Sequence, residues 1–329
     1  MTAWLREIAT EPTTLGILSG LGLLLLLVPV VVEALHRVGR IDRVLRREVY
    51  QRTGSWLVII PILVGPVLLG RTWVIATTAI LAILCHREFA RATGLFRDRV
   101  VSATVVVGIV ALTFAAFDHW YGLYVALTTI VGVAIVIGGM WGPSPSGYLQ
   151  RVALGSLAFL LFGVCLTHYS YFANDSHYRP LLLGLLLCIE LNDVFAFVVG
   201  KSVGGPKLVP RISPGKTIAG SVGAMVLTTS LFCWVGHSMF AATPLAHPGH
   251  WIALGVIISI TGQLGDLVLS SVKRDLGIKD MGQLIPGHGG LLDRFDSLLL
   301  AVPAAFHYVH YFAGVGLDRP VRVWTGNGG

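Results

Sequence analysis

This sequence contains few charged residues for its length. Only 12% of its 329 residues are Asp, Glu, Lys or Arg, while 54% are hydrophobic. A soluble domain carries roughly 25% charged residues, so this chain has too little polar surface to cover a water-soluble globule. The shortage extends along the whole chain, which also excludes a soluble protein with one membrane anchor. The composition therefore indicates an integral membrane protein with several spanning helices.

Cysteine is also scarce, and its positions form no paired motif. Cys85, Cys165, Cys188 and Cys233 each lie in an apolar run, and no two of them make a C-x-x-C pair. This pattern is typical of small buried hydrophobic residues. Neither a disulfide framework nor a cysteine metal site is expected.

Apolar runs of about 20 residues, the length that crosses a bilayer, recur along the sequence. The first run, 15–35, has no basic segment before it, so we interpret it as a retained helix rather than a cleaved signal. The pair 54–70 and 72–86 is short and tightly linked, so nine and ten spans are both open. We therefore expect an all-α, polytopic transmembrane helical bundle. The other candidate spans are 100–117, 120–141, 150–172, 180–200, 218–242, 251–272 and 297–314.

Basic residues are distributed unevenly between alternate loops. If the N-terminus lies outside, 19 of the 24 Lys and Arg residues fall in segments that face the cytoplasm. Because loops rich in Lys and Arg stay in the cytoplasm, we expect the N-terminus outside and the polar loops 201–217 and 273–296 inside. The formal net charge of +7 then reflects topology and contact with lipid headgroups. Nucleic acid is not an expected partner.

The chain shows no internal repeat and no separate soluble domain. We divide it into N-terminal transmembrane helices at 1–180, a transmembrane region at 181–314 that carries both polar loops, and a flexible tail at 315–329. The chemistry is expected in the second part.

Acidic residues interrupt the apolar helix expected at 180–200. Glu190 and Asp193 are three residues apart and share one face of that helix. A carboxylate within a span is costly, and it is kept mainly where it lines a polar cavity or has a partner. The pair is therefore a candidate site, while a polar cluster that only packs helices together is the alternative.

The basic loop that follows has the composition of a phosphate-binding segment. It contains Lys207 and Arg211, and then the run Ser213-Pro-Gly-Lys216-Thr217. Lys and Arg supply charge, and hydroxyl and backbone N–H groups donate to phosphate oxygens. The run is not a Walker A loop, because the first glycine of that motif is missing. A solvated loop that only sets the topology is the alternative.

A second segment is denser in charge. Its acidic residues are Asp266, Asp275, Asp280, Asp293 and Asp296, and its basic residues are Lys273, Arg274, Lys279 and Arg294. The turn His288-Gly289-Gly290 lets the backbone approach a ligand closely. Mg²⁺ takes one or two carboxylates plus phosphate oxygens, so the segment suits metal-assisted phosphoryl chemistry. A salt-bridged surface loop is the alternative. Asp193 and Asp266 are expected at the same depth, close to the inner face of the membrane.

The run from Ser270 to Asp296 resembles the signature of the phosphatidate cytidylyltransferase family without a gap, and Ser213–Thr217 resembles a second block of that family. The resemblance implies that Asp266 and Asp293 bind the catalytic cations, Mg²⁺ with K⁺ as a candidate second ion. The catalytic residues that it implies are Asp266, Asp293, Lys216, Lys273 and Arg274. The substrate-binding residues that it implies are Asp193, Lys207, Arg211, Ser213, Thr217, Lys279, Asp280, His288, Gly289, Gly290, Arg294 and Asp296.

One departure from the family pattern lies in the helix before the basic loop. Where the family reads Asp-Thr-Gly-Ala-Tyr, this chain keeps Asp193 and continues Val194-Phe195-Ala196-Phe197. The sequence thus resembles a divergent branch. The departure bears on lipid or nucleotide preference more than on the type of reaction.

The activity implied by the resemblance is transfer of the cytidylyl group of CTP to phosphatidate, giving CDP-diacylglycerol and pyrophosphate. A CTP-dependent lipid kinase and a cytidylyltransferase for another lipid phosphate stay open, and an ion-coupled transporter that uses Glu190, Asp193 and Asp266 is a remoter alternative. The expected partners are CTP, phosphatidate and membrane lipids, and a homodimer is an open alternative. The expected location is the bacterial inner membrane, with the active site facing the cytoplasm.

Overall fold

The structure, a computed structural model, describes residues 11–142, 145–282 and 289–326. It is built from long helices and one small hairpin. The N-terminal helices are α2 (Pro12–Arg37), α3 (Arg43–Leu69), α4 (Arg71–Thr93), α5 (Arg99–Phe117), α6 (Tyr121–Gly138), α7 (Tyr148–Ala158) and α8 (Leu166–Phe172). The C-terminal elements are α9 (Tyr178–Val203), β1 (Lys207–Val209), β2 (Ser213–Thr217), α10 (Ile218–Met239), α11 (Pro248–Asp275) and α12 (Leu292–Ala313). A π-helical stretch, Phe159–Cys165, joins α7 to α8.

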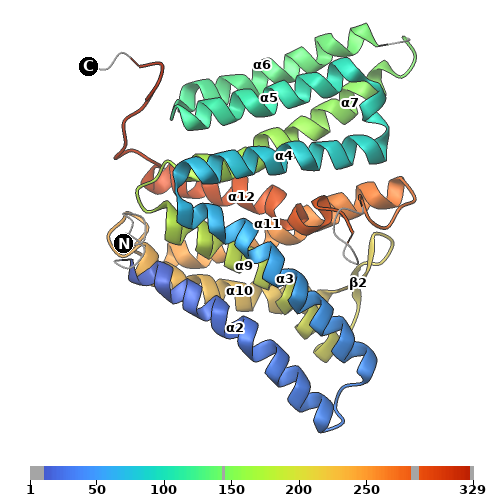
Figure 1. Cartoon of the computed structure of the whole chain (residues 1–329), viewed down its shortest axis with the longest axis vertical. Coiled ribbons are helices and arrows are strands. Elements are labelled where there is room, and N and C mark those ends of the chain that lie inside the picture. The colour runs from blue at the N-terminus through green and yellow to red at the C-terminus, as the bar shows by residue number, and fades with distance from the viewer. Residues whose placement is uncertain (1–10, 143–144, 283–288, 327–329) are drawn as a thin grey trace.

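The helices pack in successive groups. In Figure 1, α5, α6 and α7 form the upper group, α4 and α12 lie beneath it, and α9, α10 and α11 follow. Helices α2 and α3 contact each other and α9 at the lower edge of the same view. The C-terminal helices α9 to α12 thus form a bundle that α4 and α8 connect to the N-terminal helices.

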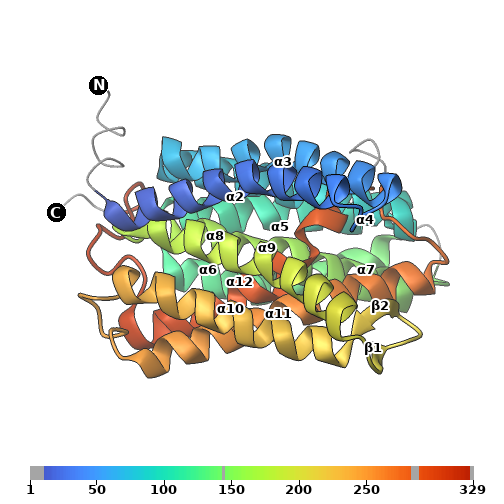
Figure 2. The ribbon, with the colours of Figure 1, turned by 90° about the horizontal axis from the view of Figure 1, so that it is seen from below.

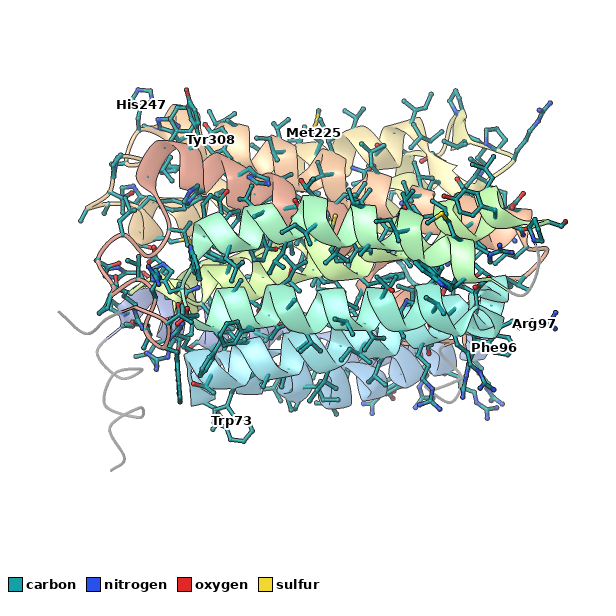
Figure 3. The ribbon with its side chains drawn as sticks, turned by 90° about the horizontal axis from the view of Figure 1, so that it is seen from above. Trp73, Phe96, Arg97, Met225, His247 and Tyr308 are labelled. Atoms are coloured by element: carbon teal, nitrogen blue, oxygen red, sulfur yellow. The ribbon has the colours of Figure 1, made fainter. Side chains whose placement is uncertain are left out.

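Turns gather at two opposite ends of the bundle (Figure 2). What we call the hairpin end carries the turns 38–42, 94–98 and 276–282 together with the β1–β2 hairpin. What we call the tail end carries the turns 118–120, 173–177 and 240–247 together with the segment 314–326. Figure 3 shows Arg97 toward the hairpin end and His247 toward the tail end.

The outer surface of the bundle is apolar along the helices. Side chains such as Leu26, Val107 and Trp234 are about two-thirds exposed or more, which suits lipid rather than water. By length and composition, eight helices among the described residues could each cross a membrane. The all-α, polytopic membrane fold is therefore confirmed, while the count of nine or ten spans and the outside N-terminus stay predictions.

Most of the expected spans match one helix to within a few residues, while 150–172 covers α7, the π-helical stretch and α8. Several helices, α3 and α4 among them, continue past the expected span at the hairpin end. The short pair 54–70 and 72–86 becomes two long helices, α3 and α4, which break at Gly70 with a φ of 135°. Helix α11 continues to Asp275 and α12 begins at Leu292, so both ends of the second polar loop are helical. Hydropathy marks only the part of a helix that lies in lipid, so it does not indicate these polar extensions.

The first polar loop, 201–217, folds partly as the antiparallel hairpin of β1 and β2. Lys207 pairs with Thr217 and Val209 pairs with Ser213. The hydroxyl of Thr217 accepts a hydrogen bond from the backbone N–H of Gly220 at 3.0 Å, so it caps the start of α10.

The tail end also has its own contacts. The carboxylate of Asp118 accepts hydrogen bonds from the backbone N–H groups of Trp324 and Thr325 and from the Thr325 hydroxyl. These contacts place residues up to 326 against the turn between α5 and α6. The flexibility expected for the tail stays a prediction.

A buried polar cluster joins α9, α10 and α11. Asn192 Oδ1 accepts hydrogen bonds from Thr228 Oγ1 at 3.0 Å and from Ser259 Oγ at 2.6 Å. Close by, Gly220 packs on Gly200, and a Cβ on Gly220 would lie 3.0 Å from the Cα of Gly200. Small residues let helices approach closely in a membrane, where side-chain hydrogen bonds add to packing. The cluster therefore fixes α9 beside α10 and α11.

Asn192→Ala is expected to destabilise the protein by about 1–2 kcal/mol, because the hydroxyls of Thr228 and Ser259 lose their shared acceptor. The measurement is the thermal unfolding temperature in detergent micelles. Ser230→Ala is the control, since this exposed residue of α10 bonds only to the carbonyl of Val226, one turn earlier in its own helix. Equal unfolding temperatures for the two variants would contradict the role of the cluster.

Candidate functional site

Acidic residues from three helices meet near the hairpin end. Asp193 of α9, Asp266 of α11 and Asp296 of α12 are electrostatic neighbours, although they come from distant parts of the chain. Lys216 of β2 interacts electrostatically with Asp193. The structure therefore brings together residues from both polar segments that sequence analysis singled out.

Lys216 and Asp266 form the first ion pair of the site. Lys216 Nζ lies 2.5 Å from Asp266 Oδ2. The other carboxylate oxygen, Oδ1, accepts a hydrogen bond from Ser270 Oγ at 3.1 Å, one turn further along α11. The hairpin is thereby held against α11, and Arg274 adds a second link by donating from Nε to the carbonyl oxygen of Ile212 at 3.1 Å.

Ser297 orients two further carboxylates. Its hydroxyl donates to Asp193 Oδ2 at 2.8 Å, and its backbone N–H donates to Asp296 Oδ1 at 2.9 Å. Asp296 is only 8% exposed, so its charge is largely screened from water. One residue of α12 thus fixes an acidic group on its own helix and another on α9.

Lys273 and Asp293 form the second ion pair, at the start of α12. Lys273 Nζ lies 2.9 Å from Asp293 Oδ1. Asp293 Oδ2 accepts hydrogen bonds from the backbone N–H groups of Met281 at 2.9 Å and Gly290 at 3.0 Å. The carboxylate therefore ties α11 and both flanks of the glycine-rich turn to α12.

Gly289 is a position where the backbone itself requires glycine. Its φ is 80°, in the left-handed region that side chains disfavour. A Cβ there would also lie 3.1 Å from Asp293 Oδ2 and 3.2 Å from Asp280 Oδ1. The glycine thus allows the turn to close over Asp293.

Gly265 lets α11 and α12 approach each other beside the carboxylates. A Cβ on Gly265 would overlap the carbonyl oxygen of Asp296. Asp266 follows directly on α11, so this close approach is what makes Asp266 and Asp296 neighbours.

The other expected site residues lie around this centre. Thr217 is buried as the cap of α10, and Arg294 has an electrostatic interaction with Glu190. His288 lies outside the described residues. The exposed members, which face water at the hairpin end, are Lys207, Arg211, Lys279 and Asp280.

Glu88 belongs to the site and was missed by sequence analysis. It lies on α4 and is 5% exposed, and its carboxylate accepts hydrogen bonds from the backbone N–H groups of Leu291 and Leu292 at 3.0 and 2.8 Å. The expected span ended at 86, which left residue 88 in a loop. The sequence contained one signal for Glu88: this carboxylate comes directly before Phe89, in a segment that continues an apolar helix.

Carboxylates outnumber lysines at the centre of the site. The four carboxylates of its centre are Asp193, Asp266, Asp293 and Asp296. In the described structure they face two lysines, Lys216 and Lys273. Buried carboxylates need partners, so a site with more carboxylates than lysines suits a divalent cation.

Oxygen is the ligand type that Mg²⁺ prefers, so these residues fit that ion. Within the described residues no three acidic, His or Cys side chains already converge on one metal position. Mg²⁺ is commonly held by one or two carboxylates, with water and substrate phosphate completing its shell. Asp266 and Asp293, the ligands expected from the sequence, both interact with Lys273, and their role in holding a metal stays a prediction.

Comparisons with known proteins agree with the chemistry of this site. The sequence model of the cytidylyltransferase family matches residues 50–312. A phosphatidate cytidylyltransferase of Mycobacterium bovis is 32% identical over 81% of this chain and 89% of its own length. One from Staphylococcus aureus is 38% identical over 47% of this chain and 55% of its own. An uncharacterised protein of Escherichia coli, YnbB, is 31% identical over 80% of this chain and 88% of its own.

Gly265→Ala is expected to destabilise the protein by about 1–3 kcal/mol, because the added methyl group forces α11 away from α12. The measurement is the thermal unfolding temperature in detergent. Gly262→Ala is the matched control in the same helix, since its Cβ would make only an ordinary contact, 3.7 Å from Asn192 Nδ2. The close approach at Gly265 would not matter if both variants unfolded at the wild-type temperature.

Proposed function

Because the chain belongs to the cytidylyltransferase family, we propose that it transfers the cytidylyl group of CTP to phosphatidate. The products are CDP-diacylglycerol and pyrophosphate. The chain is an integral membrane nucleotidyltransferase, and the choice of phosphatidate follows the names of its mycobacterial and staphylococcal relatives. The observation that carries the proposal is the meeting of Asp193, Asp266 and Asp296 beside Lys216.

The reaction is a direct displacement at the α-phosphorus of CTP. A phosphate oxygen of phosphatidate forms a bond to this phosphorus, and the bond between the α-phosphorus and the bridging oxygen breaks, so pyrophosphate leaves with that electron pair. The attacking phosphate is already ionised at neutral pH, so the step needs no strong general base. Catalysis then depends on positioning and charge neutralisation.

The lysines of the site are suited to hold phosphate groups. Lys216 and Lys273 are already fixed by Asp266 and Asp293, so their ammonium groups need little further ordering when an anion arrives. Lys216 comes from the hairpin that also carries Arg211 and Ser213. We assign the hairpin to the phosphates of CTP, and Lys273 with Arg294 to the triphosphate or the lipid phosphate.

Asp266 and Asp293 would hold Mg²⁺, with K⁺ as a candidate second ion. Bound there, Mg²⁺ would neutralise charge that builds up on the transferring phosphoryl group. The protein itself contributes the arrangement: Ser270 orients Asp266, and the backbone of Met281 and Gly290 orients Asp293.

The location of the site suits two substrates of opposite solubility. A diacyl lipid stays in the bilayer because each buried methylene contributes about 0.8 kcal/mol, while CTP arrives through water. We assign the hairpin end to the cytoplasm, on the distribution of Lys and Arg, and the protein to a bacterial inner membrane. A homodimer stays a prediction.

A cytidylyltransferase for another lipid phosphate is the second candidate. It is favoured by Phe197, which replaces the tyrosine of the family pattern, is 47% exposed and stacks under Lys201 Nζ at 5.0 Å. The departure thus lies on an exposed face of α9, four residues after Asp193. A change there affects which lipid is accepted more readily than it affects the carboxylates.

Purified protein with Mg²⁺, phosphatidate and CTP labelled at the α-phosphorus is expected to yield labelled lipid, whereas label at the γ-phosphorus is expected to stay in pyrophosphate. Asp266→Asn and Asp293→Asn are each expected to lower the rate at least about a hundredfold, because charge stabilisation at the reacting phosphate is lost. Asp275→Asn is the matched control at an exposed position of the same segment.

Three outcomes would contradict the proposal. Lipid labelled from the γ-position would identify a kinase, and labelling only with another lipid phosphate would identify the second candidate. A rate for Asp293→Asn equal to that of the Asp275→Asn control would exclude Asp293 from the reaction.

The orientation has its own test in intact bacterial cells. In a Cys233→Ser background, His177→Cys at the tail end is expected to react with a membrane-impermeant maleimide. Asp275→Cys at the hairpin end is expected to react only after the cells are broken, because both positions are exposed but lie at opposite ends of the bundle. The reverse pattern would place the site outside the cytoplasm.

A further inference from the structure

We propose that Glu88 is a positioning residue, which holds the backbone around Asp293 in its working shape from a helix of the N-terminal half. The consequence for catalysis rests on the proposed function, because it assumes that Asp293 acts in the transfer. The contacts on which the proposal stands do not depend on that function.

Both oxygens of the Glu88 carboxylate bind the start of α12. Oε1 accepts from the N–H of Leu291, and Oε2 accepts from the N–H of Leu292. The first N–H groups of a helix have no partner within the helix, and a negative charge is favourable there. Glu88 therefore caps α12 from α4, about two hundred residues away in the sequence.

Two glycines surround the same carboxylate. A Cβ on Gly282 would lie 2.5 Å from Glu88 Oε1, and a Cβ on Gly290 would lie 2.6 Å from Oε2. Any side chain at either position would have to push the carboxylate away from α12. The backbone therefore closes on Glu88 at both flanks of the turn.

Glu88 and Asp293 contact neighbouring residues of the same two backbone segments. The N–H of Gly290 donates to Asp293, while the next two N–H groups, of Leu291 and Leu292, donate to Glu88. On the other flank, the N–H of Met281 donates to Asp293 and Gly282 packs on Glu88. The two carboxylates thus contact the same two backbone segments, so we expect a displacement of Glu88 to move the backbone that holds Asp293.

The same contacts occupy the N-terminus of α12, so it is not free to bind phosphate. A free helix N-terminus beside basic residues is suited to bind phosphate. Here the N–H groups of Leu291 and Leu292 are taken by Glu88. Phosphates of the substrates are then left to the side chains of Lys273 and Arg294 and to the hairpin with Lys216.

Glu88→Gln tests the proposal with a side chain of the same size. An amide group can accept through only one of its two terminal atoms, so one of the two backbone N–H groups loses its partner. Hydrogen exchange of peptides covering 289–293, measured without substrate or Mg²⁺, is expected to quicken about tenfold or more. Peptides covering the hairpin, 207–217, are expected to exchange as in the wild type.

For Glu88→Gln we expect a lower kcat with a nearly unchanged KM for the lipid. The kcat for lipid cytidylylation is expected to fall about tenfold to a hundredfold, because a displacement of about 1 Å at a catalytic group has that effect. The KM for the lipid is expected to stay within about threefold, since Glu88 does not reach the membrane-facing surface. Glu33→Gln is the matched control, because Glu33 of α2 pairs with Arg37 of α2 and Arg46 of α3 and, within the described residues, has no contact with the carboxylates of the site.

Gly282→Ala gives a second test that leaves Glu88 in place. Its Cβ would displace the Glu88 carboxylate, so we expect the same faster exchange at 289–293 and the same fall in kcat. If Glu88→Gln fails to fold, Gly282→Ala still tests the role of Glu88.

Unchanged exchange at 289–293 in both variants would overturn the proposal. Faster exchange with an unchanged kcat would reduce Glu88 to a structural cap of α12. If the wild-type protein made no CDP-lipid at all, the proposed function would fail, while the exchange experiment would still report on Glu88.

Discussion

Two lysine–carboxylate pairs, Lys216 with Asp266 and Lys273 with Asp293, hold the site together. Each pair joins segments that are distant in the sequence, and in the second pair the side chains are only 12% and 6% exposed. Breaking a buried pair is costly because it leaves one charge alone in a poorly solvated place. Asp193 and Asp296 lie beside these pairs, so the site is rich in carboxylate oxygens, which are the ligands that a divalent cation such as Mg²⁺ prefers.

Helix packing, rather than loop structure, sets the distances between these charges. The contact of Gly265 with the backbone of Asp296 brings α11 against α12, and the contact of Gly220 with Gly200 brings α10 against α9. In a membrane the hydrophobic effect does not drive helices together, so small residues and polar side chains decide which helices approach. The carboxylates of three helices thus meet because the residues beside them have almost no side chain.

The sequence predicted the membrane fold well, because apolar runs of bilayer length indicate helices directly. It also placed Asp193 and Asp266 at one depth, since both lie near the same ends of their helices. Hydropathy could not indicate that α11 continues through Lys273, because polar helix beyond the lipid has no apolar signal. Nor could it reveal Glu88, whose role depends on α4 reaching the start of α12, a contact between halves of the chain that no local pattern encodes.

The starting points of the helices explain how a water-soluble nucleotide reaches carboxylates inside a bundle. Helix α10 begins at Ile218, two residues after Lys216, and α12 begins at Leu292, directly before Asp293. By contrast, α9 and α11 continue about 14 Å beyond Asp193 and Asp266, to Val203 and Asp275, at 1.5 Å per residue. The chain that leaves α9 and α11 therefore returns to the carboxylates at Lys216 of β2 and at Asp293 of α12. A transporter needs its charges accessible from both sides in turn, whereas the carboxylates of this site lie beside the hairpin, at one end of the bundle.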